Sequence, residues 1–400
     1  MPIAYRDDPP VSAEVVIVGG GIVGAATAFH AARAGLRPLV LERRPALSTL
    51  TTAAATGGFR LQLDDDEEVA LVRESVDLFR HFADATGQRE HDPAVREAGY
   101  LWLTTSEATA AAQRETVERQ RGWGLDDVDL VTGEDVRLSW PFVAPEVVQA
   151  RFRQADGLLD PIQAALGLAA GASALGAAFA PGVEVTGFRL VGDRVDAVET
   201  SRGVVRTAAA VIAAGPFSGA LAARAGARLP LATIRRQKVV VPQAPEVPAD
   251  APMVIDEDTG AHWRPALGGA FVLGPDPGER PSPPTDPVPT DPALAFRLLD
   301  PRNDASVARV APFWNDVWER SPQFFMAAGH YTMTPDHRPL LGPAGIEGLW
   351  VNTGYSGRGV MGGPAGSRHL ADVLTGRIPP SDNAYRPDRP MPDRRRTEAL

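Results

Sequence analysis

The chain has 400 residues, of which 44% are hydrophobic and 22% are charged, and its formal net charge is -10. This length and composition are typical of a globular protein with room for two domains. The acidic balance argues against nucleic acid as a partner, because phosphate binding needs clustered positive charge. The absence of cysteine excludes disulfides, thiolate metal sites and a thiol nucleophile, and no apolar run is long enough to cross a membrane. We therefore expect a cytoplasmic protein with a small-molecule partner.

The first predicted elements form a strand–helix–strand unit of the kind that binds dinucleotides. A β-branched strand over residues 15–18 leads into a glycine turn with the G-x-G-x-x-G spacing, and a helix over 25–34 follows. The second strand, over 37–42, ends in Glu42. This acid follows the glycines by about 20 residues, the spacing at which a carboxylate accepts a hydrogen bond from a ribose hydroxyl. The glycines of the turn are Gly19, Gly21 and Gly24.

Residues 63–87 are expected to form one amphipathic helix, so the dinucleotide-binding unit is interrupted here. The apolar face of this helix consists of Val69, Val72, Val76 and Phe79. An acidic run over 64–68 precedes the first turn of the face. Acids at a helix N-terminus complement the helix dipole, and we favour this reading over a carboxylate site.

The middle of the chain contains strand patterns of two kinds. Residues 181–221 hold two alternating runs joined by a Gly-Asp turn, and then the apolar run AAVIAAG, which predicts a second buried strand. Four alternating segments between 229 and 273 predict an antiparallel sheet, as in a second domain. The proline-dense stretch 275–292 reads as an exposed connection, and a helical piece over 305–320 follows it.

The last part of the chain repeats the combination of strand, glycine turn and helix. The stretch GLWVNTGYSGRGV, residues 348–360, leads into a helix from about Gly363. A glycine turn that opens a helix presents backbone N–H groups and the positive end of the helix dipole to an anion. A nicotinamide enzyme needs only one contiguous dinucleotide domain, so this second turn favours FAD.

Several motifs occur in order over residues 12–378. They are the N-terminal glycine turn, TGGFRLQ, VEVTGF, AAVIAAGPFSGAL, RRQ, TPDHRPLLG and GYSGRGVM. In this combination the chain resembles the FAD-dependent amine and amino-acid oxidoreductases of the D-amino-acid oxidase type, which include glycine oxidase, sarcosine oxidase and related proline dehydrogenase subunits.

The resemblance implies an α/β fold with a discontinuous, Rossmann-like FAD-binding domain similar to that of glutathione reductase. A mainly antiparallel α+β substrate-binding domain interrupts it. We expect the FAD-binding domain to comprise residues 12–80, 145–228 and 325–380, the substrate-binding domain to comprise 81–144 and 229–324, and a C-terminal tail to comprise 381–400.

The same resemblance implies a set of residues that bind FAD. The first glycines approach the pyrophosphate, Glu42 accepts a hydrogen bond from the adenosine ribose, and Val185 contacts the adenine through its backbone. Residues 52–56 line the channel to the flavin, and 357–360 form the turn beneath its ring. The implied set is Gly19, Gly21, Ile22, Val23, Gly24, Glu42, Arg43, Thr52, Ala55, Thr56, Val185, Ala214, Gly215, Gly354, Gly357, Arg358, Gly359 and Val360.

Four residues are candidates for catalysis or substrate contact. Arg60 matches the family's arginine on the substrate side of the flavin, where its guanidinium would hold a carboxylate; a structural ion pair is the alternative. Tyr331 stands near the place of a carboxylate-binding arginine. His262 shares a strand face with Arg264 and either hydrogen-bonds substrate or is a satisfied surface histidine. Arg358 either favours an anionic reduced flavin or pairs with a nearby acid.

Three departures from the family pattern bear on the chemistry. Some relatives tether flavin through a cysteine near Gly329 or a histidine in the stretch matching 49–58, and neither tether is present, which implies noncovalent FAD. The usual lysine anchor after the last glycine turn is matched by Met361. The lysine that activates dioxygen in some relatives is matched by Val272; the only lysine here, Lys238, could replace it if it faces the flavin, and otherwise has an outward or packing role.

The resemblance implies flavin-dependent oxidation of the C–N bond of an amine or amino acid to an imine, with secondary amino acids preferred. Hydride transfer to FAD and reoxidation by O2 would give H2O2, without a metal. One alternative is a dehydrogenase subunit that passes electrons to another acceptor, and another is a noncatalytic FAD-binding scaffold. A monomer and a homo-oligomer are both compatible with the sequence.

Overall fold

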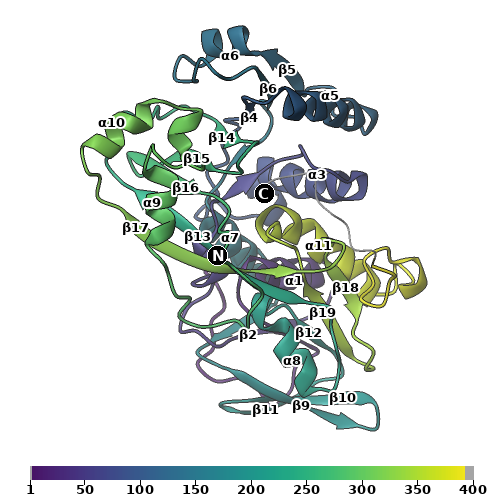
Figure 1. The fold of residues 1–400 in the computed structure, drawn as a ribbon. Helices are drawn as coiled ribbons and strands as arrows, with labels where there is room; N and C mark the ends of the chain where they lie inside the picture. Colours follow the sequence, from purple (N-terminus) through teal and green to yellow (C-terminus); the bar gives the residue numbers. More distant parts are fainter. Residues whose placement is uncertain (1, 392–400) are drawn as a thin grey trace.

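A six-stranded sheet brings the two glycine-rich ends of the chain together in the computed structural model, which describes residues 2–391 (Figure 1). Its strands, in spatial order, are β18 (Leu340–Pro343), β19 (Leu349–Thr353), β12 (Ala210–Ile212), β1 (Val15–Val18), β2 (Pro38–Glu42) and β8 (Ala178–Pro181). All neighbours are parallel except β18 and β19. The carboxyl ends of β1, β12 and β19 therefore meet at one edge, where ligands of parallel sheets bind.

Helices cover one face of this sheet and a small sheet covers the other. Helix α1 (Ile22–Arg33) contacts α7 (Pro161–Ala174) and α11 (Gly359–Leu374), and α3 (Asp66–Arg80) contacts α11. Apolar residues of α1, α3 and α7 form one core with β1 and β2. A second core on the opposite face includes residues of α8 (Ser218–Arg224) and of a three-stranded sheet. The strands of that sheet are β9 (Val185–Val191), β10 (Arg194–Thr200) and β11 (Gly203–Arg206).

An eight-stranded sheet forms the rest of the framework and lies above the six-stranded sheet in Figure 1. Its order is β17 (Phe325–Met333), β13 (Ala232–Val241), β16 (Gly269–Leu273), β15 (His262–Ala266), β14 (Met253–Asp256), β4 (Tyr100–Thr104), β6 (Gln149–Arg153) and β5 (Asp129–Thr132). Only the pairing of β14 with β4 is parallel. One face is apolar and packs against α9 (Ala293–Leu299) and α10 (Phe313–Glu319).

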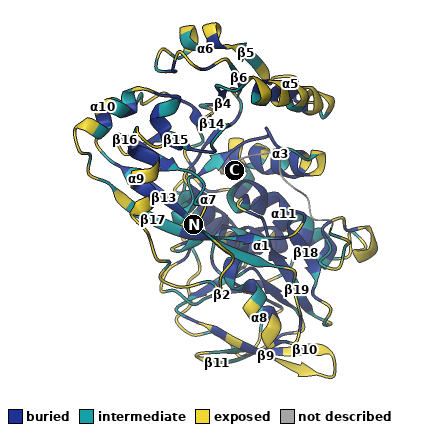
Figure 2. Cartoon of the chain, in the orientation of Figure 1, coloured by how far each residue is buried: buried dark blue, intermediate teal, exposed yellow. Residues whose placement is uncertain are grey.

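Figure 2 shows how burial differs between these parts: α1 and α7 are buried on nearly all sides, whereas α5 (Glu107–Gly122) exposes its outer side. Other short elements are α2 (Thr51–Ala54), β3 (Gly58–Phe59), α6 (Gly133–Ser139) and β7 (Gly157–Leu158). Over the part of the chain that the structure describes, no helix is both long and apolar enough to span a bilayer.

The elements differ from the sequence expectations at several places. The expected helix over 63–87 is two helices, α3 and α4 (Phe82–Thr86), separated at His81. Two strands from segments that we assigned to the FAD-binding domain, β6 and β17, hydrogen-bond into the eight-stranded sheet. The proposed domain boundaries therefore run through this sheet, because the position of glycines and apolar runs does not reveal which sheet a strand joins.

The described part of the expected C-terminal tail, residues 381–391, packs against the body of the protein. Asn383 and Tyr385 are buried, and the guanidinium of Arg389 lies 2.8 Å from a carboxylate oxygen of Asp336. The arginine-rich run PDRRR, which the sequence suggested to be a solvated tail, lies outside the described residues.

Candidate cofactor and substrate site

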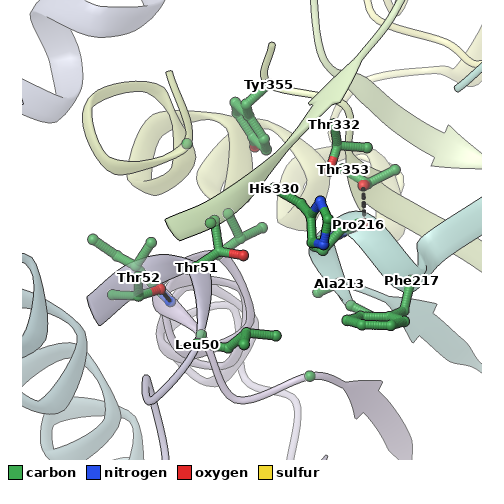
Figure 3. Close-up of a pocket in the computed structure, with 18 of the residues that line it drawn as sticks. Leu50, Thr51, Thr52, Ala213, Pro216, Phe217, His330, Thr332, Thr353 and Tyr355 are labelled. Carbon is green, nitrogen blue, oxygen red and sulfur yellow. Dashed lines mark hydrogen bonds between the residues drawn. The ribbon is translucent and has the colours of Figure 1, made fainter. Parts of the chain in front are cut away.

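A long cavity begins at the shared edge of the six-stranded sheet and extends to β13, β16 and β17 of the eight-stranded sheet. Figure 3 shows its middle part: Thr51 and Thr52 from one wall face His330 and Thr332 of β17, and Pro216 and Phe217 lie beside them. The hydroxyl of Thr353, at the end of β19, donates to the carbonyl of Gly215 at 3.3 Å. Segments distant in sequence thus build one continuous wall.

The first glycine turn has a geometry that only glycine tolerates. Gly19 has a φ of +113°, and a Cβ there would lie 2.5 Å from the carbonyl oxygen of Ala213. A Cβ at Gly24 would lie 1.8 Å from the carbonyl oxygen of Gly19. Helix α1 starts at Ile22, three residues earlier than the sequence suggested, and its N-cap residue Gly21 has no side chain to cap it. Its N-terminal turn lines the cavity, which suits a pyrophosphate.

Glu42 stands at the end of β2 beside this turn. Its carboxylate accepts from the backbone N–H of Gly20 at 2.6 Å and from that of Arg44 at 2.8 Å. The side chain is therefore fixed at the cavity wall, where the sequence placed a ribose ligand. The N–H of Ile22 in turn donates to the hydroxyl of Thr52 at 3.1 Å, which holds α2 against the start of α1.

Most of the implied FAD-binding residues line this cavity. They are Gly19, Gly21, Ile22, Val23, Glu42, Arg43, Thr52, Ala55, Thr56, Val185, Ala214, Gly215, Gly354, Gly357, Gly359 and Val360. Gly24 lies beneath the turn, where it permits the close approach of Gly19. The structure brings these residues together from six different segments; their individual roles toward FAD stay predictions.

Of the two expectations for Arg358, the geometry matches pairing with a nearby acid, although the pair is buried and does not face solvent. Arg358 is buried, and its guanidinium is ion-paired with the carboxylate of Glu68 in α3. From the sequence we expected the acidic run that includes Glu68 only to complement the helix dipole. Because the carboxylate compensates the positive charge, and because Arg358 is not among the lining residues, an effect of this charge on the flavin finds no support in the geometry.

The cavity ends against a face of the eight-stranded sheet that carries cations and aromatic rings. Arg236 and Lys238 line the cavity from β13, whereas Arg235 pairs with Glu279 at 2.8 Å on the other side. Tyr331 of β17 also lines the cavity, and its ring packs where a Cβ of Gly357 would lie, 2.5 Å away. The alternation of β13 thus settles which of its charged residues face the site.

Arg60 and His262 lie near this end but are not among the lining residues. Arg60 is buried, donates to the carbonyl of Gln62 and lies 5.1 Å from the ring centre of Trp102. The Nδ1 atom of His262 is 2.9 Å from the carbonyl oxygen of Gly260, and burial lowers the pKa of this histidine to about 4. Roles of Arg60 and His262 toward a substrate stay predictions.

Two buried polar groups that the sequence did not single out hold these residues in place. Asp156 is fully buried and accepts from the backbone N–H of Leu61 at 2.8 Å and from Arg153 at 2.6 Å. It therefore fixes the segment that follows Arg60. Burial raises the pKa of its carboxyl group, and the charge of Arg153 opposes this rise.

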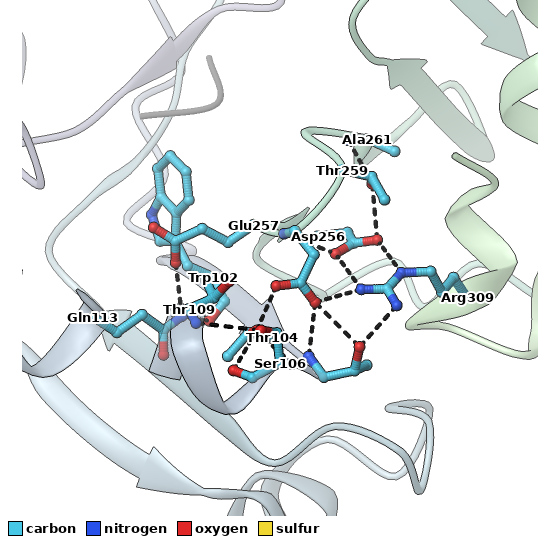
Figure 4. Close-up of polar contacts among 12 residues, drawn as sticks. Trp102, Thr104, Ser106, Thr109, Gln113, Asp256, Glu257, Thr259, Ala261 and Arg309 are labelled. Carbon is cyan, nitrogen blue, oxygen red and sulfur yellow. Dashed lines mark hydrogen bonds and ion pairs between the residues drawn. The ribbon is translucent and has the colours of Figure 1, made fainter. Parts of the chain in front are cut away.

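The second group fixes the loop that leads into β15. Figure 4 shows the buried carboxylate of Asp256 accepting from Arg309 at 2.8 Å and from the hydroxyl of Thr259 at 2.8 Å, while Glu257 accepts from Gln113 at 2.7 Å. This loop positions β15, which carries His262 and Arg264. The run of acids at 256–258 gave no signal of such a role in the sequence alone.

Comparison with known proteins places the chain in a family. The sequence model described as FAD dependent oxidoreductase matches residues 14–373. The chain belongs to the FAD-dependent oxidoreductase family. The resemblance stated from the sequence motifs, the mixed α/β fold and FAD as cofactor are thereby confirmed.

Relatives of this FAD-dependent oxidoreductase include both oxidases and dehydrogenases. It is 29% identical to the glycine oxidase of Pseudomonas aeruginosa, over 94% of this chain and 98% of that protein. It is 27% identical to the D-amino acid dehydrogenase of Cereibacter sphaeroides, over 92% and 93%. It is also 27% identical to human mitochondrial sarcosine dehydrogenase, over 92% of this chain but 40% of that protein. The chain thus spans two fifths of that relative's length.

Solved structures of the family share the fold. The L-proline dehydrogenase from P. horikoshii superposes with a TM-score of 0.80 at 24% identity, covering 94% of this chain and 96% of that one. The glycine oxidase from Bacillus cereus has a TM-score of 0.77 at 22% identity, covering 92% and 96%. At these identities the likeness establishes the fold of the oxidoreductase.

Proposed function

We propose that this oxidoreductase oxidises the C–N bond of an amino acid or related amine to an imine, with secondary amino acids preferred. The observation that carries the proposal is the single cavity that joins the start of α1 to the cationic and aromatic face of the eight-stranded sheet. One end suits a dinucleotide and the other suits a small anionic molecule. The oxidation of amino acids and N-methylated glycines by relatives supports the same class of substrate.

The residues of this chain have the tasks of binding, orienting and excluding water. The first turn of α1 would hold the pyrophosphate, and Glu42 the ribose, while the 51–56 segment and the turn at Gly357 would enclose the flavin ring. When bound, FAD would supply the acceptor for the hydride, with the two electrons of the C–H bond on the carbon beside nitrogen, and loss of a proton from nitrogen completes the imine. The ring of Tyr331 would close the wall next to Gly357 and keep water from the reacting carbon.

We also propose that FAD is held without a covalent bond. Gly329 occupies the place near which some relatives carry a tethering cysteine, and no histidine occurs in residues 49–58. Gly329 is moreover close to α2, since a Cβ there would lie 3.0 Å from the Cβ of Ala54. Denaturation of the purified protein in acid should therefore release all of the yellow cofactor into the supernatant; retention of colour in the precipitate would contradict the proposal.

Dioxygen is the proposed final electron acceptor, with H2O2 as its product. The alternative, a dehydrogenase that uses another acceptor, is favoured by the sarcosine and D-amino acid dehydrogenases among the relatives. The two differ in one measurement: the rate at which air restores the visible absorbance after an amino acid has reduced the bound FAD. Restoration within the turnover time, with stoichiometric H2O2, supports the oxidase, and slow restoration supports the dehydrogenase.

The proposed reaction itself is tested by anaerobic mixing of the FAD-loaded protein with a panel of amino acids and amines. The panel should contain N-methylglycine, proline, glycine and their carboxyl-free counterparts. We expect at least one amino acid to abolish the visible absorbance of the flavin and to yield an imine-derived carbonyl product. FAD that no member of the panel can bleach would instead support a noncatalytic scaffold.

A further inference from the structure

The cavity contains the chain's single lysine. Lys238 is 6% exposed and projects from β13, with its Nζ 3.1 Å from the carbonyl oxygen of Ala55 and 4.1 Å from the ring centre of Phe271. Both contacts are to neutral groups. The sequence left open whether Lys238 faces the site or packs elsewhere, and the structure places it at the cavity wall next to the end of α2.

A second cation lies against the same ring. Arg264 of β15 stands opposite Phe271 in the sheet, and its guanidinium carbon is 4.6 Å from the ring centre. Its hydrogen bond goes to the carbonyl of Pro265 at 3.0 Å, and its Nε atom is buried with no partner. Two positive charges thus share one aromatic ring; Lys238 lines the cavity, whereas Arg264 and Phe271 lie next to it, outside the lining residues.

Among the residues that the structure describes, neither Lys238 nor Arg264 pairs with a carboxylate. Two acids of the adjoining loops are already engaged: Asp156 pairs with Arg153, and Glu257 pairs with Arg151. The other charged or titratable groups that face this end are Arg60, Arg96, Tyr100, Asp160, Arg236 and Tyr331.

Holding both charges here costs free energy when no anion is present. Burial together with the charge of Arg264 lowers the pKa of Lys238 to about 8, and burial lowers the pKa of Arg264 to about 10. An anion bound between the two groups would offset this cost, because charge-assisted hydrogen bonds to a carboxylate are strong where water is excluded.

We propose that Lys238 and Arg264 bind the carboxylate of the substrate beside the ring of Phe271. The inference rests on the proposed function, since it assumes an amino-acid substrate, and it replaces Arg60 as the expected anchor. In this arrangement the carboxylate lies against β13 and β15, and the rest of the substrate extends along the cavity toward the turn at Gly357. Specificity for amino acids over simple amines then comes from these two strands.

The test uses FAD-loaded protein and a carboxylic acid that lacks an amine, such as methoxyacetate or benzoate, titrated while the visible spectrum of the flavin is recorded. Lys238→Gln retains a donor for the carbonyl of Ala55 but removes the charge, whereas Lys238→Met removes both. We expect Lys238→Gln and Arg264→Met each to weaken binding of the acid about 10- to 100-fold. The control is Arg189→Gln, which removes an exposed cation of β9 that pairs with Glu199. This variant should bind the acid as the wild type does.

The same variants should raise KM for an amino acid and leave KM for its carboxyl-free counterpart unchanged. Wild-type affinity for the acid in Lys238→Gln and Arg264→Met would overturn the inference, and so would a selective loss in Arg60→Met alone. If Lys238 only caps α2, Lys238→Met would weaken FAD binding while Lys238→Gln would behave as the wild type. A wild-type protein that binds the acid but is reduced by no amine would refute the proposed function and leave this site intact.

Discussion

Single glycines decide the shape of the dinucleotide turn. Replacement of Gly24 by alanine would put a Cβ 1.8 Å from the carbonyl oxygen of Gly19, so the turn has to shift away from the position that accepts a pyrophosphate. We expect Gly24→Ala to lose about 1–3 kcal/mol of stability and most of its bound FAD. The ratio of flavin to protein absorbance after purification, together with the thermal midpoint, measures both effects.

Gly219→Ala is the matched control for this substitution. Gly219 lies in helix α8, where a Cβ would meet only the side chain of Leu231 at 3.9 Å. Alanine is the better helix former, so this variant should keep its FAD and gain slightly in stability. Equal FAD content in Gly24→Ala and Gly219→Ala would contradict the role given to the turn.

The charge of Lys238 also predicts a pH dependence of stability. The folded-state pKa is lowered from 10.5 to about 8, so the buried charge destabilises the protein fully below pH 8. This cost disappears as the pH rises from 8 to 10.5. The wild type should therefore gain about 3 kcal/mol relative to Lys238→Met across this window in the absence of a carboxylate ligand. Urea unfolding of both proteins at the two ends of the window measures the difference; parallel pH profiles would show that the charge is not buried.

The sequence predicted the glycine turn correctly, but it did not predict which charged side chains of β13 face the cavity. The spacing of Gly19, Gly21 and Gly24 predicts the turn because it lies between a strand and a helix that are followed by a second strand ending in an acid. Strand alternation in 234–238 separates two faces without saying which one meets the cavity. Arg60 was expected at the substrate, yet it is buried against Trp102, a contact that depends on how β4 crosses the preceding segment.

At the scale of elements, the proline-rich stretch has a role that its composition did not reveal. We call residues 276–291 the strap. Its Asp286 binds Arg43 at 2.6 Å and Arg44 at 2.5 Å, and the backbone N–H of Thr285 donates to Nε2 of His330 at 3.1 Å. The three partners line opposite sides of the cavity. The strap therefore crosses from the wall formed after β2 to the wall formed by β17.

The strap should slow the release of FAD. Arg43 also lies 3.9 Å from the ring centre of Phe217, so Asp286 holds a side chain that closes the cavity. Partly exposed ion pairs contribute about 0.5–1 kcal/mol each, and we expect Asp286→Asn to accelerate FAD release about 5-fold. The fluorescence increase of freed flavin after dilution measures the rate. Asp8→Asn, which removes an exposed partner of Arg202 elsewhere, is the control, and equal rates in all three proteins would refute the role of the strap.

Elements were predictable where a local pattern is sufficient. The strands at 15–18 and 38–42, the core-facing side of α3 and the left-handed glycine after α1 follow from hydrophobic periodicity and glycine placement. The break between α3 and α4 and the membership of β6 in the eight-stranded sheet depend on packing between distant segments, which periodicity does not describe.

At the scale of the whole molecule, a buried ion pair connects the first and last parts of the FAD-binding framework. Arg358, after β19, pairs with Glu68 of α3, and both side chains are less than a tenth exposed. Removal of the Glu68 carboxylate takes an ion-pair partner away from a buried guanidinium. We expect Glu68→Gln to lower the free energy of unfolding by about 3 kcal/mol, as measured by urea unfolding.

Glu74→Gln serves as the control on the same helix. Glu74 pairs with Arg368 of α11, but both side chains are about two fifths exposed. Such a pair contributes at most about 1 kcal/mol, so this variant should unfold close to the wild type. If the two variants lost equal stability, the buried pair of Glu68 and Arg358 would contribute no more to the free energy of unfolding than an exposed pair does.

Residues 15–42 and 349–374 meet at one sheet, and the cavity at this junction is the proposed binding site of FAD. The most direct measurement is the visible spectrum of the purified protein supplied with FAD, recorded before and after anaerobic addition of N-methylglycine, proline or glycine. We expect a flavin spectrum that at least one of these amino acids abolishes. A folded protein that takes up no FAD, or whose bound FAD none of the amino acids reduces, would contradict the proposed function.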